Sequence, residues 1–109
     1  MNLNKLAVEI NQNAKDHGWW DNERAFGEII ALIHSEASEA LEEYRNGHGI
    51  KEIYYSVNKK PEGIPVELSD IIIRVLDLCG QYNIDIEKAI SKKMMYNRNR
   101  PYRHGGKVI

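Results

Sequence analysis

Two acidic pairs with the same spacing are the residues of this chain whose types and positions most favour chemistry. They are Glu36-Ala-Ser-Glu39 and Glu67-Leu-Ser-Asp70. Because 16 of the 109 residues are acidic, roughly two such pairs are expected by chance, usually on solvated helix faces. Their position on the helices therefore has to decide whether these pairs form a site.

Helical geometry places both pairs beside the apolar stripes of their helices. The stripe of the second helix, which we expect to face the core, consists of Phe26, Ile29, Ile30, Ile33, Ala37, Ala40, Leu41 and Tyr44. At about 100° per residue, Glu36 falls at the edge of this stripe, and Glu67 falls on the same side of the stripe in the next helix. If the two helices pack as an antiparallel pair, all four carboxylates face a shared groove and repel one another unless a cation lies among them. Hard carboxylate oxygens select Mg²⁺, with Mn²⁺ as a possible substitute. The pattern predicts a Mg²⁺-dependent hydrolase with Glu36, Glu39, Glu67 and Asp70 as metal ligands.

Apolar residues at helical spacing predict the elements that must position these acids. The first helix spans about residues 2–16, and the second follows a cap at Asp21 or Asn22 and runs to about residue 46. The third helix starts at Pro65 and ends near Gly80, and the fourth follows a cap at Asp85 and continues to about residue 97. Between the second and third helices, residues 47–64 form a long loop, in which the β-prone run Ile53-Tyr54-Tyr55 indicates a possible two-strand element. We expect one all-α domain over residues 1–109, a four-helix bundle.

Composition limits the classes of function. The chain is 42% hydrophobic, which is ordinary for a globular domain, and its net charge of -1 argues against stable binding to nucleic acid. It contains no apolar run resembling a signal peptide or a membrane span, so we expect a cytoplasmic location and no membrane partner. The single cysteine, Cys79, falls in an apolar stripe and is expected to be buried rather than catalytic.

The fourth helix has a lysine at a position that its apolar stripe would assign to an apolar residue. The stripe of Ile86, Ala89 and Ile90 continues into Lys93 and Asn97. One interpretation is that the aliphatic stem packs while the ammonium group reaches water. The other is that Lys93 awaits a phosphate oxygen, which fits the basic residues that follow it: Arg98, Arg100, Arg103, His104 and Lys107.

Together these motifs resemble the MazG-like family of the all-α nucleoside triphosphate pyrophosphohydrolases. The family signature is E-x-x-E, a spacer, then E-x-x-D, which Glu36-Ala-Ser-Glu39 and Glu67-Leu-Ser-Asp70 match. The segment Lys93-Met-Met-Tyr-Asn97 and the ending from Arg98 to Lys107 are also similar to the family, so the resemblance covers nearly the whole chain. Ser35 departs from the pattern, because some relatives have another acid directly before the first pair.

The resemblance implies cleavage of a nucleoside triphosphate to the monophosphate and pyrophosphate, with Mg²⁺ bound by the acidic pairs. Glu36 is our first choice for the general base, because desolvation beside the apolar stripe would raise its pKa, and Glu43 is held in reserve. Lys93 would assist at the phosphates. Asn97 and Arg100 would bind phosphate or sugar. Relatives bind the nucleobase with the first helix and the segment after it, which correspond here to His17, Trp19 and Trp20; a tryptophan pair at this place can equally be core.

The assembly and two rival functions complete the expectations. Val66 and Ile73 lie opposite the main stripe of the third helix, which indicates a homodimer or homotetramer that packs through the second and third helices. One rival is a non-catalytic module that binds nucleotide or a partner protein. Within enzymes, the rival is phosphoribosyl-ATP pyrophosphohydrolase, which shares the helical fold and the acidic site.

Overall fold

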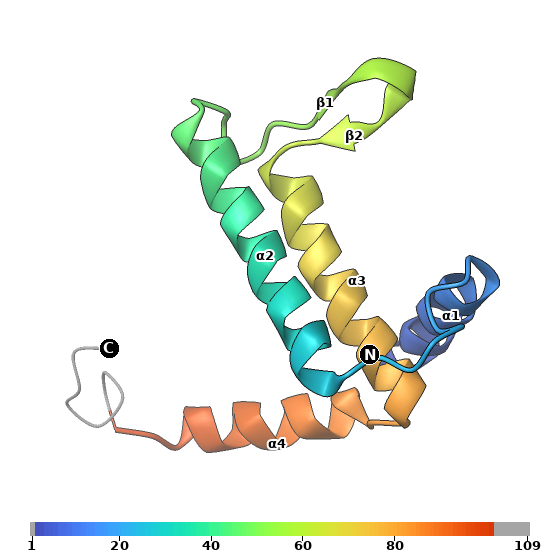
Figure 1. The fold of residues 1–109 in the computed structure, drawn as a ribbon. Coiled ribbons are helices and arrows are strands. Elements are labelled where there is room, and N and C mark those ends of the chain that lie inside the picture. Colours follow the sequence, from blue (N-terminus) through green and yellow to red (C-terminus); the bar gives the residue numbers. More distant parts are fainter. Residues whose placement is uncertain (1, 102–109) are drawn as a thin grey trace.

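The computed structural model describes residues 2–101, which fold almost entirely into helices (Figure 1). The elements in chain order are α1 (Leu3–Asp16), α2 (Phe26–Arg45), β1 (Tyr54–Tyr55), a 3₁₀ turn (Val57–Lys59), β2 (Pro61–Glu62), α3 (Ile64–Tyr82) and α4 (Ile86–Arg98). The two short strands pair antiparallel, with Tyr54 opposite Glu62. The predicted all-α class and the possible strand pair are confirmed.

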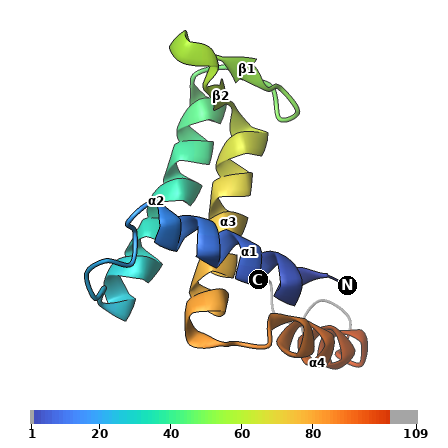
Figure 2. The same cartoon turned by 90° about the vertical axis from the view of Figure 1, so that its right-hand side faces the viewer.

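Helix α3 is the centre of the arrangement. It lies antiparallel beside α2, and α1 packs across α3 (Figures 1 and 2). None of the helices in the described part of the chain combines the length and the apolar character that crossing a bilayer requires. The antiparallel α2–α3 pair is the arrangement that the acidic site needs.

Helix α4 extends away from the other helices instead of lying alongside them (Figure 1). Its first turn is held by Asn4 of α1, whose side-chain oxygen accepts hydrogen bonds from the backbone N–H groups of Ile86 (3.1 Å) and Glu87 (3.3 Å). The Asn4 side-chain amide also donates to Asp85 (2.8 Å). Asp85 caps α4 as predicted, since its carboxylate accepts from the Lys88 N–H at 3.0 Å. The four helices therefore do not form one closed bundle within the described chain.

The crossing of α1 and α3 is unusually close at Gly80. A Cβ atom added there would lie 2.6 Å from the Ala7 carbonyl oxygen and 2.6 Å from Cβ of Asn11. We predicted that the third helix ends near Gly80, and α3 ends close to it, at Tyr82, where Asn83 adopts a left-handed conformation with φ of 55°. Gly80 thus serves close helix packing rather than helix termination.

The hydrophobic core lies at this crossing and is small. Ala7, Leu76 and Cys79 are buried, and Leu3, Ile10, Val75 and Ile86 pack against them. Cys79 is only 4% exposed, which confirms the prediction that it is buried, and burial raises the pKa of its thiol.

Helix α2 is rotated relative to our prediction. It begins at Phe26 after Ala25, so neither Asp21 nor Asn22 caps it. Its buried residues are Ile29 and Glu36. Much of the apolar stripe that we expected to face the core is exposed, including Phe26 (58%), Leu41 (57%) and Tyr44 (61%). Glu36 is therefore buried with Ile29, while part of the apolar stripe of α2 faces outward.

Candidate metal centre and adjoining cavity

Three of the four predicted ligands meet between α2 and α3. Glu36 of α2 and Glu67 and Asp70 of α3 each place a carboxylate oxygen within 4.8 Å of the others. At that separation two unit charges repel by about 3 kcal/mol at an effective dielectric constant of about 20. Glu39, one turn after Glu36, is exposed on α2 and lies outside this triad. It is still close enough that its hydrogen bond and charge help to raise the pKa of Glu67.

Two oxygens of this triad are buried without a hydrogen-bond partner among the described residues. They are Oε2 of Glu36 and Oε2 of Glu67. A buried acceptor left unpaired costs about 1–3 kcal/mol, and more when it is charged. These oxygens are therefore the atoms for which a bound cation would supply the missing partner.

The pKa values of the triad reflect this crowding. Burial, followed by the hydrogen bond and charge of Glu39, raises the pKa of Glu67 to about 7. Burial and then the negative charge of Glu36 raise the pKa of Asp70. Burial also acts to raise the pKa of Glu36, but hydrogen bonds, first that of Arg74, outweigh it and the pKa is lowered. The raised pKa that made Glu36 our first choice as general base is not found.

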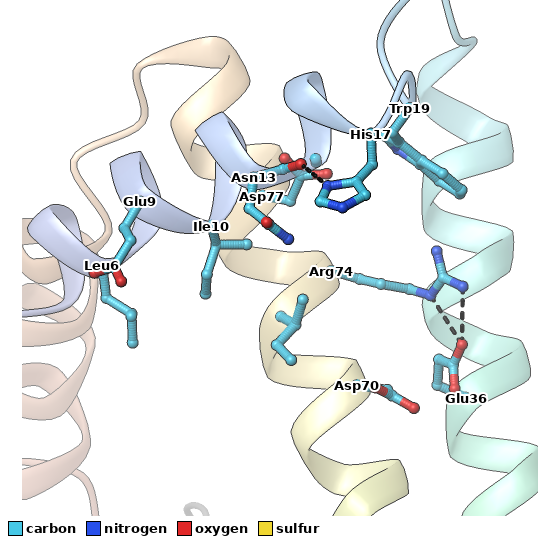
Figure 3. Close-up of a pocket in the computed structure, with 12 residues that line it drawn as sticks. Leu6, Glu9, Ile10, Asn13, His17, Trp19, Glu36, Asp70, Arg74 and Asp77 are labelled. Atoms are coloured by element: carbon cyan, nitrogen blue, oxygen red, sulfur yellow. Dashed lines mark hydrogen bonds and ion pairs between the residues drawn. The ribbon is translucent and has the colours of Figure 1, made fainter. Parts of the chain in front are cut away.

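Arg74 is the positive group that contacts the triad directly (Figure 3). Its Nε and Nη2 atoms both lie 2.9 Å from Oε1 of Glu36. Arg74 follows Asp70 by one helical turn on α3, and its guanidinium also lies 5.3 Å from the centre of the Trp19 ring. The guanidinium compensates one carboxylate oxygen and leaves the other oxygen of Glu36 unpaired.

A cavity of about 670 Å³ adjoins the triad, and Glu36, Asp70 and Arg74 form part of its wall. Its opposite wall is α1, from which Leu6, Ile10 and Asn13 face inward (Figure 3). A volume of this size is typical of pockets that hold small organic ligands. The carboxylates therefore stand at one side of a space that accommodates a ligand of nucleotide size.

The predicted base-binding residues separate into two groups. His17 and Trp19 line the cavity, and the ring of His17 bonds to the carbonyl of Asn13 at 2.8 Å. Arg24 stacks on Trp19 at 3.6 Å and donates to its backbone carbonyl. Trp20 is not part of the cavity lining, and its indole N–H donates to both oxygens of Asp77, at 3.0 and 3.2 Å. In this position Trp20 fixes the segment after α1 onto α3.

The predicted phosphate-binding residues are not brought to the cavity in this chain. Lys93 and Asn97 lie on the exposed part of α4, and Arg100 follows it; none of the three is among the described residues lining the cavity. Lys93 and Arg100 both stack near the ring of Tyr96, at 5.0 and 5.7 Å. The other basic residues of the ending, from residue 102 onward, lie outside the described residues.

Glu43, the reserve candidate for the general base, is engaged elsewhere. Its carboxylate accepts hydrogen bonds from the Tyr54 hydroxyl at 2.9 and 2.8 Å and lies 3.5 Å from His48. The bond to Glu43 is the main reason that the pKa of Tyr54 rises to about 12. Glu43 therefore ties the end of α2 to strand β1.

Two residues of the site were missed by the sequence prediction, Arg74 and Asp77. Asp77 is 8% exposed, lines the cavity, and also accepts from the side chain of Asn11 at 2.9 Å. A signal was present, because Glu67, Asp70, Arg74 and Asp77 follow one another at three- and four-residue steps and so share one face of α3.

Comparison of the chain with protein-family models, with curated proteins and with solved structures finds no match. The functional argument therefore depends on the residues and on the geometry of the cavity.

Proposed function

We propose that the protein hydrolyses a nucleoside triphosphate, ribo- or deoxy-, to the monophosphate and pyrophosphate in a Mg²⁺-dependent reaction. The observation that carries the proposal is the pair of buried, unpartnered oxygens of Glu36 and Glu67 beside a cavity of about 670 Å³. The acids provide a site for a cation, and the cavity provides a site for the molecule that the cation would help to bind.

The donor set fits a hard divalent cation. Glu36, Glu67 and Asp70 supply only carboxylate oxygens, which Mg²⁺ and Mn²⁺ prefer. Glu39, one turn from Glu36, would complete the set of four after a change of side-chain rotamer. Mg²⁺ bound here supplies charge neutralisation for phosphate oxygens and acidifies the attacking water.

The side chains around the cavity suit the rest of a nucleotide. Trp19 offers a ring face for a base, and His17 and Asn13 offer polar groups beside it. Arg74 offers a guanidinium fork that suits phosphate oxygens.

We further propose that the functional unit is a homodimer or homotetramer in which α4 of one copy reaches the cavity of another. Phe26, Leu41 and Tyr44 of α2 and Ile72 of α3 (55%) are exposed large apolar residues, a pattern that favours a subunit interface. Lys93 and Asn97 do not line the cavity of their own chain, and they lie on a helix that leaves the body of the chain (Figure 1). Assembly would bury the apolar residues and supply the phosphate-binding residues that each single chain lacks.

The test is pyrophosphate release from a panel of nucleoside triphosphates that includes modified bases and phosphoribosyl-ATP. Each substrate is assayed with Mg²⁺ and with chelator, beside the variants Glu67→Gln and Glu39→Gln. The matched control is Glu42→Gln, because Glu42 lies on α2 with its side chain 61% exposed and outside the cluster. We expect metal-dependent release that both site variants lose and the control keeps.

Two other results would each contradict a part of this proposal. Release that survives within tenfold in Glu39→Gln would remove Glu39 from the metal site. No release from any substrate, with nucleotide still raising the melting temperature, would favour a binding module.

A further inference from the structure

Arg74 supplies a positive charge to one member of the carboxylate triad. Both of its bonds fall on Oε1 of Glu36, whose side chain is only 9% exposed, and the guanidinium side chain is itself 27% exposed. Oε2 of Glu36 and Oε2 of Glu67 remain buried without partners within the described structure. One guanidinium therefore serves a cluster of three carboxylates and satisfies it only in part.

The Arg74 side chain borders the cavity as well as the carboxylate triad. Arg74 lines the cavity together with Glu36, and its long chain rises from α3 between the triad and Trp19 (Figure 3). Turning the guanidinium away from Glu36 requires rotation about side-chain bonds and no movement of the helix. In its new orientation the planar fork would face the cavity, where phosphate oxygens are bound bidentately by arginine.

We propose that Arg74 is an internal counter-ion that leaves Glu36 when a divalent cation enters the carboxylate triad, and then binds the phosphate chain of the ligand. This inference rests on the proposed function for its ligand class, but the exchange itself concerns only the metal and the arginine. Metal entry frees a positive group for the ligand, so cation and phosphate each favour binding of the other. In the metal-free site, the Arg74 guanidinium reduces the repulsion among the carboxylates. Because the metal must displace it, the same contact weakens metal binding.

The first experiment measures the affinity for Mn²⁺ alone, by electron paramagnetic resonance of free Mn²⁺, in the wild type and in Arg74→Gln. Removing the competing guanidinium is expected to tighten Mn²⁺ binding about tenfold, the effect of losing a charge-assisted hydrogen bond. The matched control is Arg24→Gln, which alters the other guanidinium beside Trp19 but leaves Glu36 untouched; its Mn²⁺ affinity should equal that of the wild type. Unchanged or weaker Mn²⁺ binding in Arg74→Gln would overturn the proposal.

The second experiment measures binding of inorganic triphosphate at saturating Mn²⁺. Arg74→Gln should bind it at least tenfold more weakly than the wild type, although it binds the metal more tightly. Equal triphosphate affinity would overturn the second half of the exchange. If Arg74→Gln does not fold, Arg74→Lys replaces it: lysine keeps the charge but cannot form the double contact with Oε1, so Mn²⁺ should bind more tightly than to the wild type, and an unchanged affinity would overturn the exchange.

These measurements separate this inference from the proposed function. Neither requires turnover, so a protein that hydrolyses no nucleotide can still show the opposite changes in Mn²⁺ and triphosphate affinity. Conversely, metal-dependent hydrolysis together with unchanged Mn²⁺ affinity in Arg74→Gln would leave the hydrolase standing and refute the exchange.

Discussion

Replacing Glu67 by glutamine should stabilise the metal-free protein at alkaline pH. The pKa of Glu67 is raised from 4.5 to about 7 in the folded chain. As the pH rises between these values, the unfolded chain releases this proton first, so the free energy of unfolding falls. The stability is complete below pH 4.5 and is lost as the pH passes about 7. Glutamine keeps the shape of the side chain and cannot ionise.

The magnitude follows from the size of the shift. At 1.36 kcal/mol per pKa unit, a shift from 4.5 to about 7 corresponds to about 3 kcal/mol. Repulsion between two carboxylates 4.8 Å apart gives a similar value of about 3 kcal/mol. Because Glu67 is half-buried and solvent screens part of its charge, we expect a gain of about 2 kcal/mol at pH 8.

The assay is urea unfolding at fixed protein concentration and in chelator, between pH 4.5 and pH 8. The wild type and Glu67→Gln should converge at pH 4.5 and separate as the pH rises, whereas Glu42→Gln should parallel the wild type. Mg²⁺ at a hundred times its dissociation constant should reverse the order at pH 8, since it adds about 2.7 kcal/mol only where the site is intact. A variant less stable than the wild type in chelator at pH 8, or a difference that does not vary with pH, would refute the reasoning.

Three further predictions test the packing, the assembly and the phosphate contacts. Gly80→Ala should lower the free energy of unfolding by about 1–3 kcal/mol, because its Cβ would lie 2.6 Å from atoms of α1. Gly27→Ala, whose Cβ would have no atom within 4 Å, should raise the free energy of unfolding by about 0.5–1 kcal/mol. Urea unfolding at constant protein concentration compares the two variants, and equal effects would contradict the close crossing of α1 and α3. Sedimentation at micromolar concentration should give a dimer or tetramer that Leu41→Lys weakens, and a monomeric wild type would exclude the proposed assembly. Lys93→Ala should raise KM or lower kcat, while the Mg²⁺-dependent rise in melting temperature stays as in the wild type. Unchanged kinetics would show that the Lys93 ammonium group contacts water and not the substrate.

Local features of the fold were predictable because they depend on neighbouring residues. The helices, the cap at Asp85 and the pair of short strands follow from apolar spacing, capping chemistry and β-propensity. The predicted start of α2 was wrong, since Asp21 and Asn22 lie five and four residues before Phe26 and the chain between them and Phe26 is not helical. Capping residues indicate that a helix is near, but the tertiary contacts of the intervening segment fix where it begins.

The orientation of α2 could not be predicted by the rule that apolar residues face the core of their own chain. That rule placed Leu41 and Tyr44 inside and Glu36 at the edge, whereas the structure exposes the first two and buries the third. The meeting of Glu36 with Glu67 and Asp70 was nevertheless predicted, because both acidic flanks lie on the same side of their stripes. The roles of Trp20 and Arg74 depend on where α1 crosses α3, which the spacing within one helix does not determine.

The hydrogen bonds of Asn4 make the position of α4 depend on the first turn of α1. Asn4 bonds to Ile86 at the start of α4, 82 positions away in the sequence, while α1, to which Asn4 belongs, forms one wall of the cavity. A ligand that displaced α1 would therefore also displace α4. For the same reason, a bulky tag or proteolytic trimming at the first few residues should disturb a helix that lies far from them in the sequence.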